Sequence, residues 1–380
     1  MPTGEREDMP AAADMSVGGS GGSGGSGSGG QQGAAGKLTA GEWKDTDNWA
    51  FWGKLMREGE YTDKSAYWGF YTDNRVAVLV EDAAGKPVAG VKVALQRGGK
   101  DLWQAVTDNA GRAELYAGLF QREEGADASV LRVSVAGVVQ AEAPLLTGWQ
   151  SEQGTVLNKY VTSVSAAPAE ADIAFIVDAT GSMGDEIAFL KEDLLDILGR
   201  ASQSQSGVHF RTAALFYRDE GDEYLTRHSD FNADFSVTHQ FVRAQQAGGG
   251  GDYPEAVHTA LEEGLQRFSW RENARTRLAF LILDAPAHYR ADVVESLHKS
   301  VETCARLGIR IIPVAASGVD KDTEFMCRFF AAATGGTYVF LTNHSGIGGD
   351  HIAPTVGQYE VEYLNDLICR VIEAYIRAGN

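Results

Sequence analysis

The chain has 380 residues, of which 44% are hydrophobic, and a formal net charge of −19 at pH 7. This length leaves room for two or three domains, and the hydrophobic content is sufficient for a large buried core. The negative charge argues against nucleic acid as a partner, because phosphate binding needs clustered Lys and Arg, and no apolar run is long enough for a transmembrane segment.

Residues 1–37 are rich in Gly and Ser, and we expect a disordered linker because this composition cannot bury apolar area. The segment resembles the tether that carries the folded part of a bacterial lipoprotein away from the membrane. That resemblance implies a lipid anchor upstream of the given sequence and an extracytoplasmic or cell-surface location. The alternative is an artefact of where the sequence starts, in a cytoplasmic protein. No signal peptide is recognisable.

Residues 38–73 form an aromatic-rich segment. Thr39 and Glu42 have the spacing of a helix capping box, which predicts the start of a helix. Aromatic residues at this density either present a flat platform for carbohydrate or pack against a folded domain. We favour packing, as a strap laid on the rest of the chain.

Residues 74–161 are predicted to form an all-β sandwich. Apolar residues alternate in three runs, around Val78, Val93 and Val133, and Gly-containing turns separate them. The turn Gly85-Lys86-Pro87-Val88 and the run Thr107 to Gly111 resemble those of the carboxypeptidase-regulatory-like or bacterial Ig-like modules. The resemblance implies a spacer or an interaction module.

Residues 170–380 alternate apolar runs with amphipathic segments, which predicts an α/β domain with a doubly wound, Rossmann-like, mostly parallel sheet. The expected strands are 172–177, 210–217, 278–283, 309–314 and 337–341. The expected helices are 185–198, 237–245, 254–268, 291–307, 323–333 and 360–378. The three cysteines, Cys304, Cys327 and Cys369, match no zinc spacing, and we expect buried thiols.

A cluster of oxygen-bearing side chains follows the first of these strands. Asp178, Thr180 and Ser182 stand at alternate positions on the turn between the strand and the next helix. Ligands of open α/β sheets bind at the carboxyl ends of strands. Carboxylate and hydroxyl oxygens without Cys favour Mg²⁺, Ca²⁺ or Mn²⁺ over softer metals. The alternative is that these groups only cap the turn and the helix.

This Asp-x-Thr-x-Ser pattern resembles the metal-ion-dependent adhesion site, or MIDAS, of von Willebrand factor type A (vWA) domains. The loop "AGGGGDYPEAV" then matches the loop that supplies a Thr ligand, and Asp252 stands in its place. The strand "LAFLILDAPAH" matches the late strand whose terminal Asp completes the site, which is Asp284. The resemblance implies metal-dependent protein binding or cell adhesion, as in a bacterial surface protein.

The cation would coordinate an acidic residue of the partner protein at an open position. Asp252 in place of a neutral hydroxyl would strengthen cation binding, weaken the attraction for an acidic partner and favour Ca²⁺. A scaffold or assembly protein that uses the domain surface without metal is the alternative. A metal-dependent hydrolase is the less favoured one, with His288 as the nearest base, and we expect no enzyme.

A second acidic group follows the second strand of this domain. Asp219, Glu220 and Asp222 fall near the same edge of the predicted sheet, where they could form an auxiliary cation site. A solvated acidic loop is the alternative.

Overall fold

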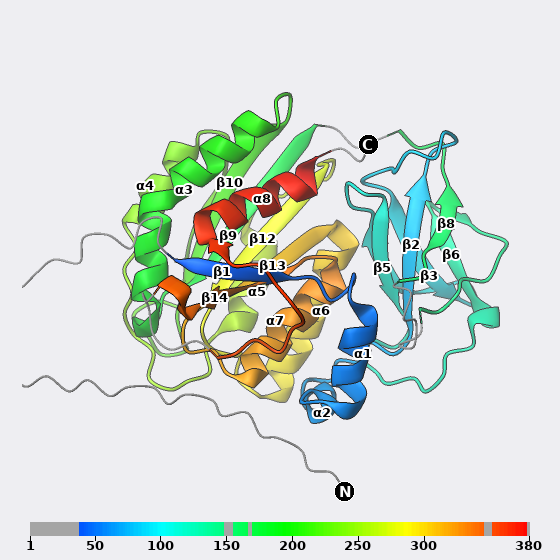
Figure 1. Ribbon diagram of the computed structural model, residues 1–380, viewed down its shortest axis with the longest axis horizontal. Helices are drawn as coiled ribbons and strands as arrows, with labels where there is room; N and C mark the ends of the chain where they lie inside the picture. The colour runs from blue at the N-terminus through cyan, green and yellow to red at the C-terminus, as the bar shows by residue number, and fades with distance from the viewer. Residues whose placement is uncertain (1–37, 148–154, 166–168, 346–351, 378–380) are drawn as a thin grey trace, which may run out of the picture. The chain divides into compact units, whose positions relative to one another are not determined.

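The computed structural model describes residues 38–147, 155–165, 169–345 and 352–377. The predicted linker at residues 1–37 lies outside the described residues. In the described part, the chain forms an α/β domain around one large sheet, together with an all-β region made of two smaller sheets (Figure 1). The predicted fold class is therefore confirmed.

Five parallel strands form the centre of the large sheet, in the order β10-β9-β12-β13-β14. Their bounds are β10 His209–Tyr217, β9 Glu170–Asp178, β12 Thr276–Leu283, β13 Ile309–Ala315 and β14 Tyr338–Thr342. These strands are almost entirely buried, because helices cover both faces of a parallel sheet. All five are strands that the apolar runs of the sequence predict.

Three antiparallel or short strands complete the described part of the sheet. β11 (Thr226–Asn232) pairs with β10 at one edge, and β1 (Thr39–Trp43) lies between β14 and β15 (Glu362–Tyr363) at the other. The prediction of a helix start at Thr39 and Glu42 is wrong. All five residues of β1 pair with β14, so the sheet satisfies the backbone groups that a helix would otherwise satisfy.

Helices cover the two faces of this sheet in two groups of three (Figure 1). One face carries α3 (Gly184–Ser204), α4 (Phe235–Arg243) and α8 (Leu364–Ile376). The other carries α5 (Val257–Arg267), α6 (Ala291–Leu307) and α7 (Lys321–Thr334). The alternation along β9 explains the division: Phe175 belongs to the core under α3 and α8, and Ile176 belongs to the core under α5 to α7.

The all-β region consists of the sheets β5-β2-β8 and β4-β3-β6-β7. The strands are β2 Arg75–Glu81, β3 Lys92–Arg97, β4 Lys100–Val106, β5 Arg112–Tyr116, β6 Leu131–Val135, β7 Val138–Val139 and β8 Asn158–Val161. Val78 of one sheet and Val93 of the other belong to the same buried core, as in a sandwich.

The aromatic segment after β1 forms α1 (Trp49–Glu58) and α2 (Thr62–Trp68). Trp52 stacks on Phe325 of α7, with ring centroids 6.0 Å apart, and Phe70 stacks on Phe329, with centroids 3.4 Å apart. Trp52 and Phe70 are fully buried, so they pack rather than present a platform for carbohydrate.

Two expectations about single features can be compared with the structure. Cys304, Cys327 and Cys369 are buried free thiols, as expected. Among the described residues, no helix combines the length and the apolar character needed to cross a membrane.

Candidate metal centre

The carboxyl ends of three neighbouring strands bring acidic side chains together. Asp178 is the last residue of β9, and Asp284 directly follows β12, the neighbour of β9 on one side. Asp219 comes two residues after the end of β10, the neighbour on the other side. These residues therefore lie at one edge of the sheet, where open α/β sheets bind their ligands.

The carboxylate of Asp178 is fully buried and only half satisfied. Its Oδ1 accepts hydrogen bonds from the backbone N–H of Thr180 at 2.8 Å and from the Thr180 hydroxyl at 2.7 Å. Its Oδ2 has no hydrogen-bond partner among the described residues, although it is buried. An unsatisfied buried oxygen of this kind costs about 1–3 kcal/mol, and more when it is charged, unless a proton or a cation meets it.

Asp284 is a second buried carboxylate at this edge, and Ser182 donates a hydrogen bond to it. Burial raises the pKa of Asp284. Burial together with the charge of Asp284 raises the pKa of Asp178 to about 7. The two carboxylates therefore repel each other in the absence of a counter-charge.

A glycine-rich loop lies against the turn that carries Thr180. The N–H of Gly248 donates to the carbonyl of Ala179 at 3.0 Å, and the N–H of Gly181 donates to the carbonyl of Gly249 at 3.2 Å. Gly250 has a φ of +74°, and a Cβ added to it would lie 3.2 Å from the Cβ of Thr180. Glycine is therefore required for this close approach.

Asp252, the residue predicted from this loop, is not brought to the cluster. Its side chain is exposed, and it is not among the charges that act most strongly on Asp178 or Asp284. Glu255, three residues later, is buried instead, and its Oε2 has no partner among the described residues. Sequence reasoning missed Glu255, and the only signal for it was its position just before the apolar face of α5.

Each carboxylate of the predicted auxiliary site is engaged by a different group. Asp219 Oδ1 bonds to His288 Nε2 at 2.7 Å, and Glu220 forms two hydrogen bonds with the guanidinium of Arg290, at 2.7 and 3.0 Å. Asp222 Oδ2 accepts from the backbone N–H groups of Gly250 at 2.9 Å and of Asp219 at 3.2 Å. These three side chains therefore stabilise the loops around the edge.

The oxygen atoms at the edge fit a hard divalent cation. In the part of the chain that the structure describes, no three side chains of His, Cys, Asp or Glu are grouped so that they alone could hold a metal. A centre at this edge therefore depends on hydroxyl groups as well, and Thr180 and Ser182 hold theirs against the carboxylates of Asp178 and Asp284. Hydroxyl and carboxylate oxygens suit Mg²⁺, Ca²⁺ and Mn²⁺.

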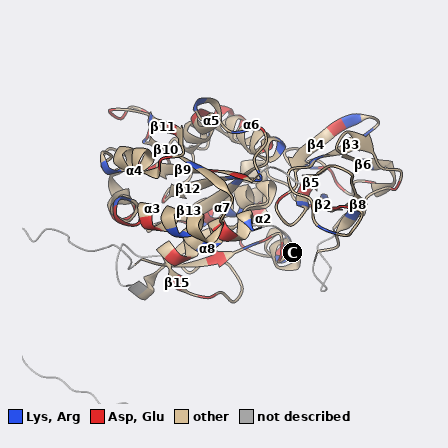
Figure 2. Ribbon diagram, turned by 90° about the horizontal axis from the view of Figure 1, so that it is seen from above, with Lys and Arg blue, Asp and Glu red and all other residues tan. Residues whose placement is uncertain are grey.

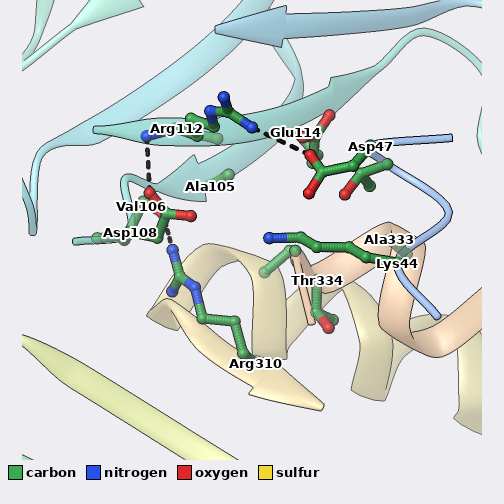
Figure 3. Close-up of a pocket in the computed structure, with 14 residues that line it drawn as sticks. Lys44, Asp47, Ala105, Val106, Asp108, Arg112, Glu114, Arg310, Ala333 and Thr334 are labelled. Atoms are coloured by element: carbon green, nitrogen blue, oxygen red, sulfur yellow. Dashed lines mark hydrogen bonds and ion pairs between the residues drawn. The ribbon is translucent and has the colours of Figure 1, made fainter. Parts of the chain in front are cut away.

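A separate pocket lies near the amino ends of the parallel strands, where Arg310 of β13 meets the all-β region (Figure 3). Lys44 points into it, and its lining also includes Asp108, Glu114 and Arg112. Arg112 pairs with Asp47 at 3.0 Å, and Arg310 donates to the carbonyl of Val106 at 2.7 Å. The charges of this pocket largely neutralise one another, so we assign it to the junction between the two regions.

No family model matches the chain. Among curated proteins, a putative ariadne-like RING finger protein, R811, of Acanthamoeba polyphaga mimivirus is 30% identical over 135 residues, which is 36% of this chain and 13% of that protein. The alpha-protein kinase vwkA of Dictyostelium discoideum is 34% identical over 119 residues, which is 31% of this chain and 19% of that protein. The match therefore spans less than a fifth of the length of either relative.

Two solved structures are also similar to the chain. A conserved hypothetical protein, BatB, from Bacteroides thetaiotaomicron matches with 14% identity and a TM-score of 0.37 over 54% of this chain and 98% of that one. Proximal thread matrix protein 1 from the mussel byssus matches with 13% identity and a TM-score of 0.38, over 56% of this chain and 48% of that one. TM-scores this low carry no argument, so the description of the fold rests on the coordinates of this chain.

Proposed function

We propose that the chain is a protein-binding module that depends on a divalent cation, held at the carboxyl edge of the large sheet. The observation that carries the proposal is the buried Oδ2 of Asp178, which has no partner among the described residues. The Asp-x-Thr-x-Ser pattern from Asp178 to Ser182 supports it, since this pattern resembles the metal-ion-dependent adhesion site of vWA domains.

Asp178, Thr180, Ser182 and Asp284 would hold the cation, which supplies a Lewis-acidic position for an acidic side chain of the partner. The chain itself orients the ligands. The N–H of Thr180 fixes the carboxylate of Asp178, and the hydroxyl of Ser182 fixes that of Asp284. We propose binding and not catalysis, because Nε2 of His288, the nearest base, is engaged by Asp219.

Titration calorimetry with Mg²⁺, Ca²⁺ and Mn²⁺ tests the cation. We expect saturable binding to the unaltered protein and none to Asp178→Ala. Asp196→Ala is the matched control, because it removes the same charge from an exposed position that pairs only with Arg200 on the same helix. Equal binding heats from the unaltered protein and Asp178→Ala would contradict the proposal.

Peptide selection tests the partner chemistry. Peptides are selected on the immobilised protein with a divalent cation present and counter-selected with EDTA. We expect Asp or Glu to be enriched at one fixed position, and the enrichment to be lost on Asp178→Ala. Cation-dependent peptides that lack an acidic residue would contradict the acidic contact.

A scaffold that works without metal is the second candidate, and an exposed aromatic pair favours it. The rings of Tyr67 and Tyr289 stack with centroids 3.5 Å apart, and 42% and 51% of these residues are exposed. Exposed Tyr is enriched where proteins bind one another. If Tyr289→Ala and Tyr67→Ala abolish partner binding while EDTA does not, this second candidate is supported and the first is not.

A further inference from the structure

We infer that Glu255, and not Asp252, is the side chain that the loop before α5 contributes to the cation. The inference rests on the proposed function, because it assigns a ligand to the same centre. Glu255 would then be the third carboxylate of the centre, together with Asp178 and Asp284.

The backbone of Glu255 is fixed to the segment that carries Asp284. Its N–H donates to the carbonyl of Pro286 at 2.9 Å. Glu255 and Ala287 also form an isolated parallel bridge. Glu255 therefore keeps its position relative to Asp284, whereas Gly251 and Asp252, just before it, are exposed.

The side chain of Glu255 is directed toward the turn of Thr180. A Cβ added to Gly250 would lie 3.2 Å from Oε1 of Glu255 and 3.2 Å from the Cβ of Thr180. The carboxylate of Glu255 and the side chain of Thr180 thus approach the same glycine. This places a carboxylate beside a hydroxyl of the proposed centre.

The surroundings of Glu255 require a positive charge. Only 4% of the residue is exposed, and its Oε2 has no hydrogen-bond partner among the described residues. The charges that act on it most strongly are the carboxylates of Asp178, Asp219, Asp284 and Asp222. A buried, unpaired carboxylate among other carboxylates is costly, and a cation bound between them removes that cost.

Asp252 has none of these properties. It is exposed, so water solvates its charge, and an exposed carboxylate contributes little to a site that it does not contact. The two residues are three positions apart in one loop. They therefore form a natural pair for comparison.

Three carboxylates carry more negative charge than a divalent cation neutralises. Ca²⁺ accepts more oxygen ligands than Mg²⁺ and also accepts both oxygens of one carboxylate, whereas Mg²⁺ keeps a strict geometry with several waters. A glutamate ligand at this position therefore favours Ca²⁺. The geometry points to Glu255 as the residue that determines the cation preference.

Calorimetric titration of the whole chain with Ca²⁺ and with Mg²⁺ tests the inference. We expect Glu255→Gln to weaken Ca²⁺ binding by about tenfold or more and to reduce the preference for Ca²⁺ over Mg²⁺. Asp252→Asn removes the same charge from the same loop, and we expect a change of about twofold. Glu255→Asp keeps the charge but shortens the side chain, and we expect a loss similar to that of Glu255→Gln.

The outcomes separate this inference from the proposed function. If the unaltered protein binds no cation, or if Asp178→Ala binds as well as the unaltered protein, the proposed function fails. If Asp178→Ala loses binding while Glu255→Gln keeps it, only the inference is overturned. Equal losses in Glu255→Gln and Asp252→Asn, or full binding by Glu255→Asp, would also overturn it, since either result indicates loop charge rather than ligation. Thermal unfolding in EDTA verifies that each variant folds.

Discussion

Asp178 and Glu255 have unusual proton affinities because they are buried beside other carboxylates. Burial and Asp284 raise the pKa of Asp178 to about 7. Burial and the carboxylates of Asp178, Asp219 and others raise the pKa of Glu255 to about 9. In an unfolded chain, both groups titrate near pH 4. The folded, metal-free protein therefore holds protons that the unfolded chain releases.

The stability of the metal-free protein is expected to fall as the pH rises. Below about pH 4 the two carboxyl groups are protonated in both states, so their contribution to stability is fully present. As the pH rises through 7 the contribution of Asp178 is lost, and that of Glu255 is lost towards pH 9. Each pKa unit corresponds to about 1.4 kcal/mol, so a loss of a few kcal/mol is expected. Urea unfolding in EDTA from pH 5 to 8 measures it.

Two comparisons identify the cause of this pH dependence. Asp178→Asn cannot ionise, so the decrease in the free energy of unfolding between pH 5 and 8 should become smaller. Saturating Ca²⁺ should also reduce the decrease, because a ligand that binds only the folded state stabilises it. A metal-free protein whose stability rises over this pH range would contradict the shifted pKa of Asp178.

The sequence predicts the candidate site only where local pattern and topology agree. Asp178 and Asp284 each follow a strongly apolar strand, and neighbouring parallel strands bring such positions to one edge, as the structure shows. The choice between Asp252 and Glu255 depends instead on the path of a glycine-rich loop. Gly249 and Gly250 have φ values of +82° and +74°, and no pattern of side chains encodes the direction that such residues give the chain.

At the scale of elements, a buried ion pair joins the N-terminal segment to α7. Asp45 follows β1, and Arg328 belongs to α7. The guanidinium of Arg328 donates to both oxygens of Asp45, at 2.6 and 2.9 Å, and also to the hydroxyl of Tyr61 at 3.1 Å. Arg328 is fully buried, so its charge depends on this carboxylate.

Asp45→Asn should therefore destabilise the protein strongly. Breaking a buried pair leaves an uncompensated charge, which costs about 3–5 kcal/mol. Asp47→Asn is the matched control: Asp47 pairs with Arg112, but their side chains are 48% and 43% exposed, and such pairs contribute about 0–1 kcal/mol. Urea unfolding of the two variants provides the comparison. A loss for Asp45→Asn no larger than that for Asp47→Asn would contradict the structural role of the pair.

The same elements show which parts of the fold the sequence can predict. β9 and β12 are continuous apolar runs, because both faces of a central parallel strand are buried. β11 reads Thr-Arg-His-Ser-Asp-Phe-Asn and has one neighbour, so its pattern resembles a polar loop. β1 pairs with residues about 300 positions away in the chain, and no local signal identifies such a partner.

At the scale of the whole molecule, acidic residues occur both in the α/β domain and in the all-β region (Figure 2). With a net charge of −19, the molecule as a whole attracts cations, and the attraction weakens as salt increases. The apparent affinity for Ca²⁺ should therefore fall between low and physiological salt in the unaltered protein. Calorimetry at two KCl concentrations measures this. An affinity independent of salt would contradict a contribution from the overall charge.

The all-β region and the α/β domain are expected to unfold together. Trp103 and Leu115 of the all-β region belong to the same buried core as Val301 of α6 and Phe329 of α7. The hydroxyl of Tyr116 also donates to a backbone carbonyl of α7 at 3.0 Å. Separating the two regions would expose this core to water, so neither should open alone.

Hydrogen exchange read by mass spectrometry at increasing urea tests this coupling. Peptides from β3 and β6 should reach the same opening free energy as peptides from β9 and β12, since only global unfolding exposes either group. Asp45→Asn should lower both values by the same amount, although Asp45 belongs to neither sheet of the all-β region. Opening of β3 and β6 at lower urea than β9 and β12 would show instead that the shared core does not couple the two regions.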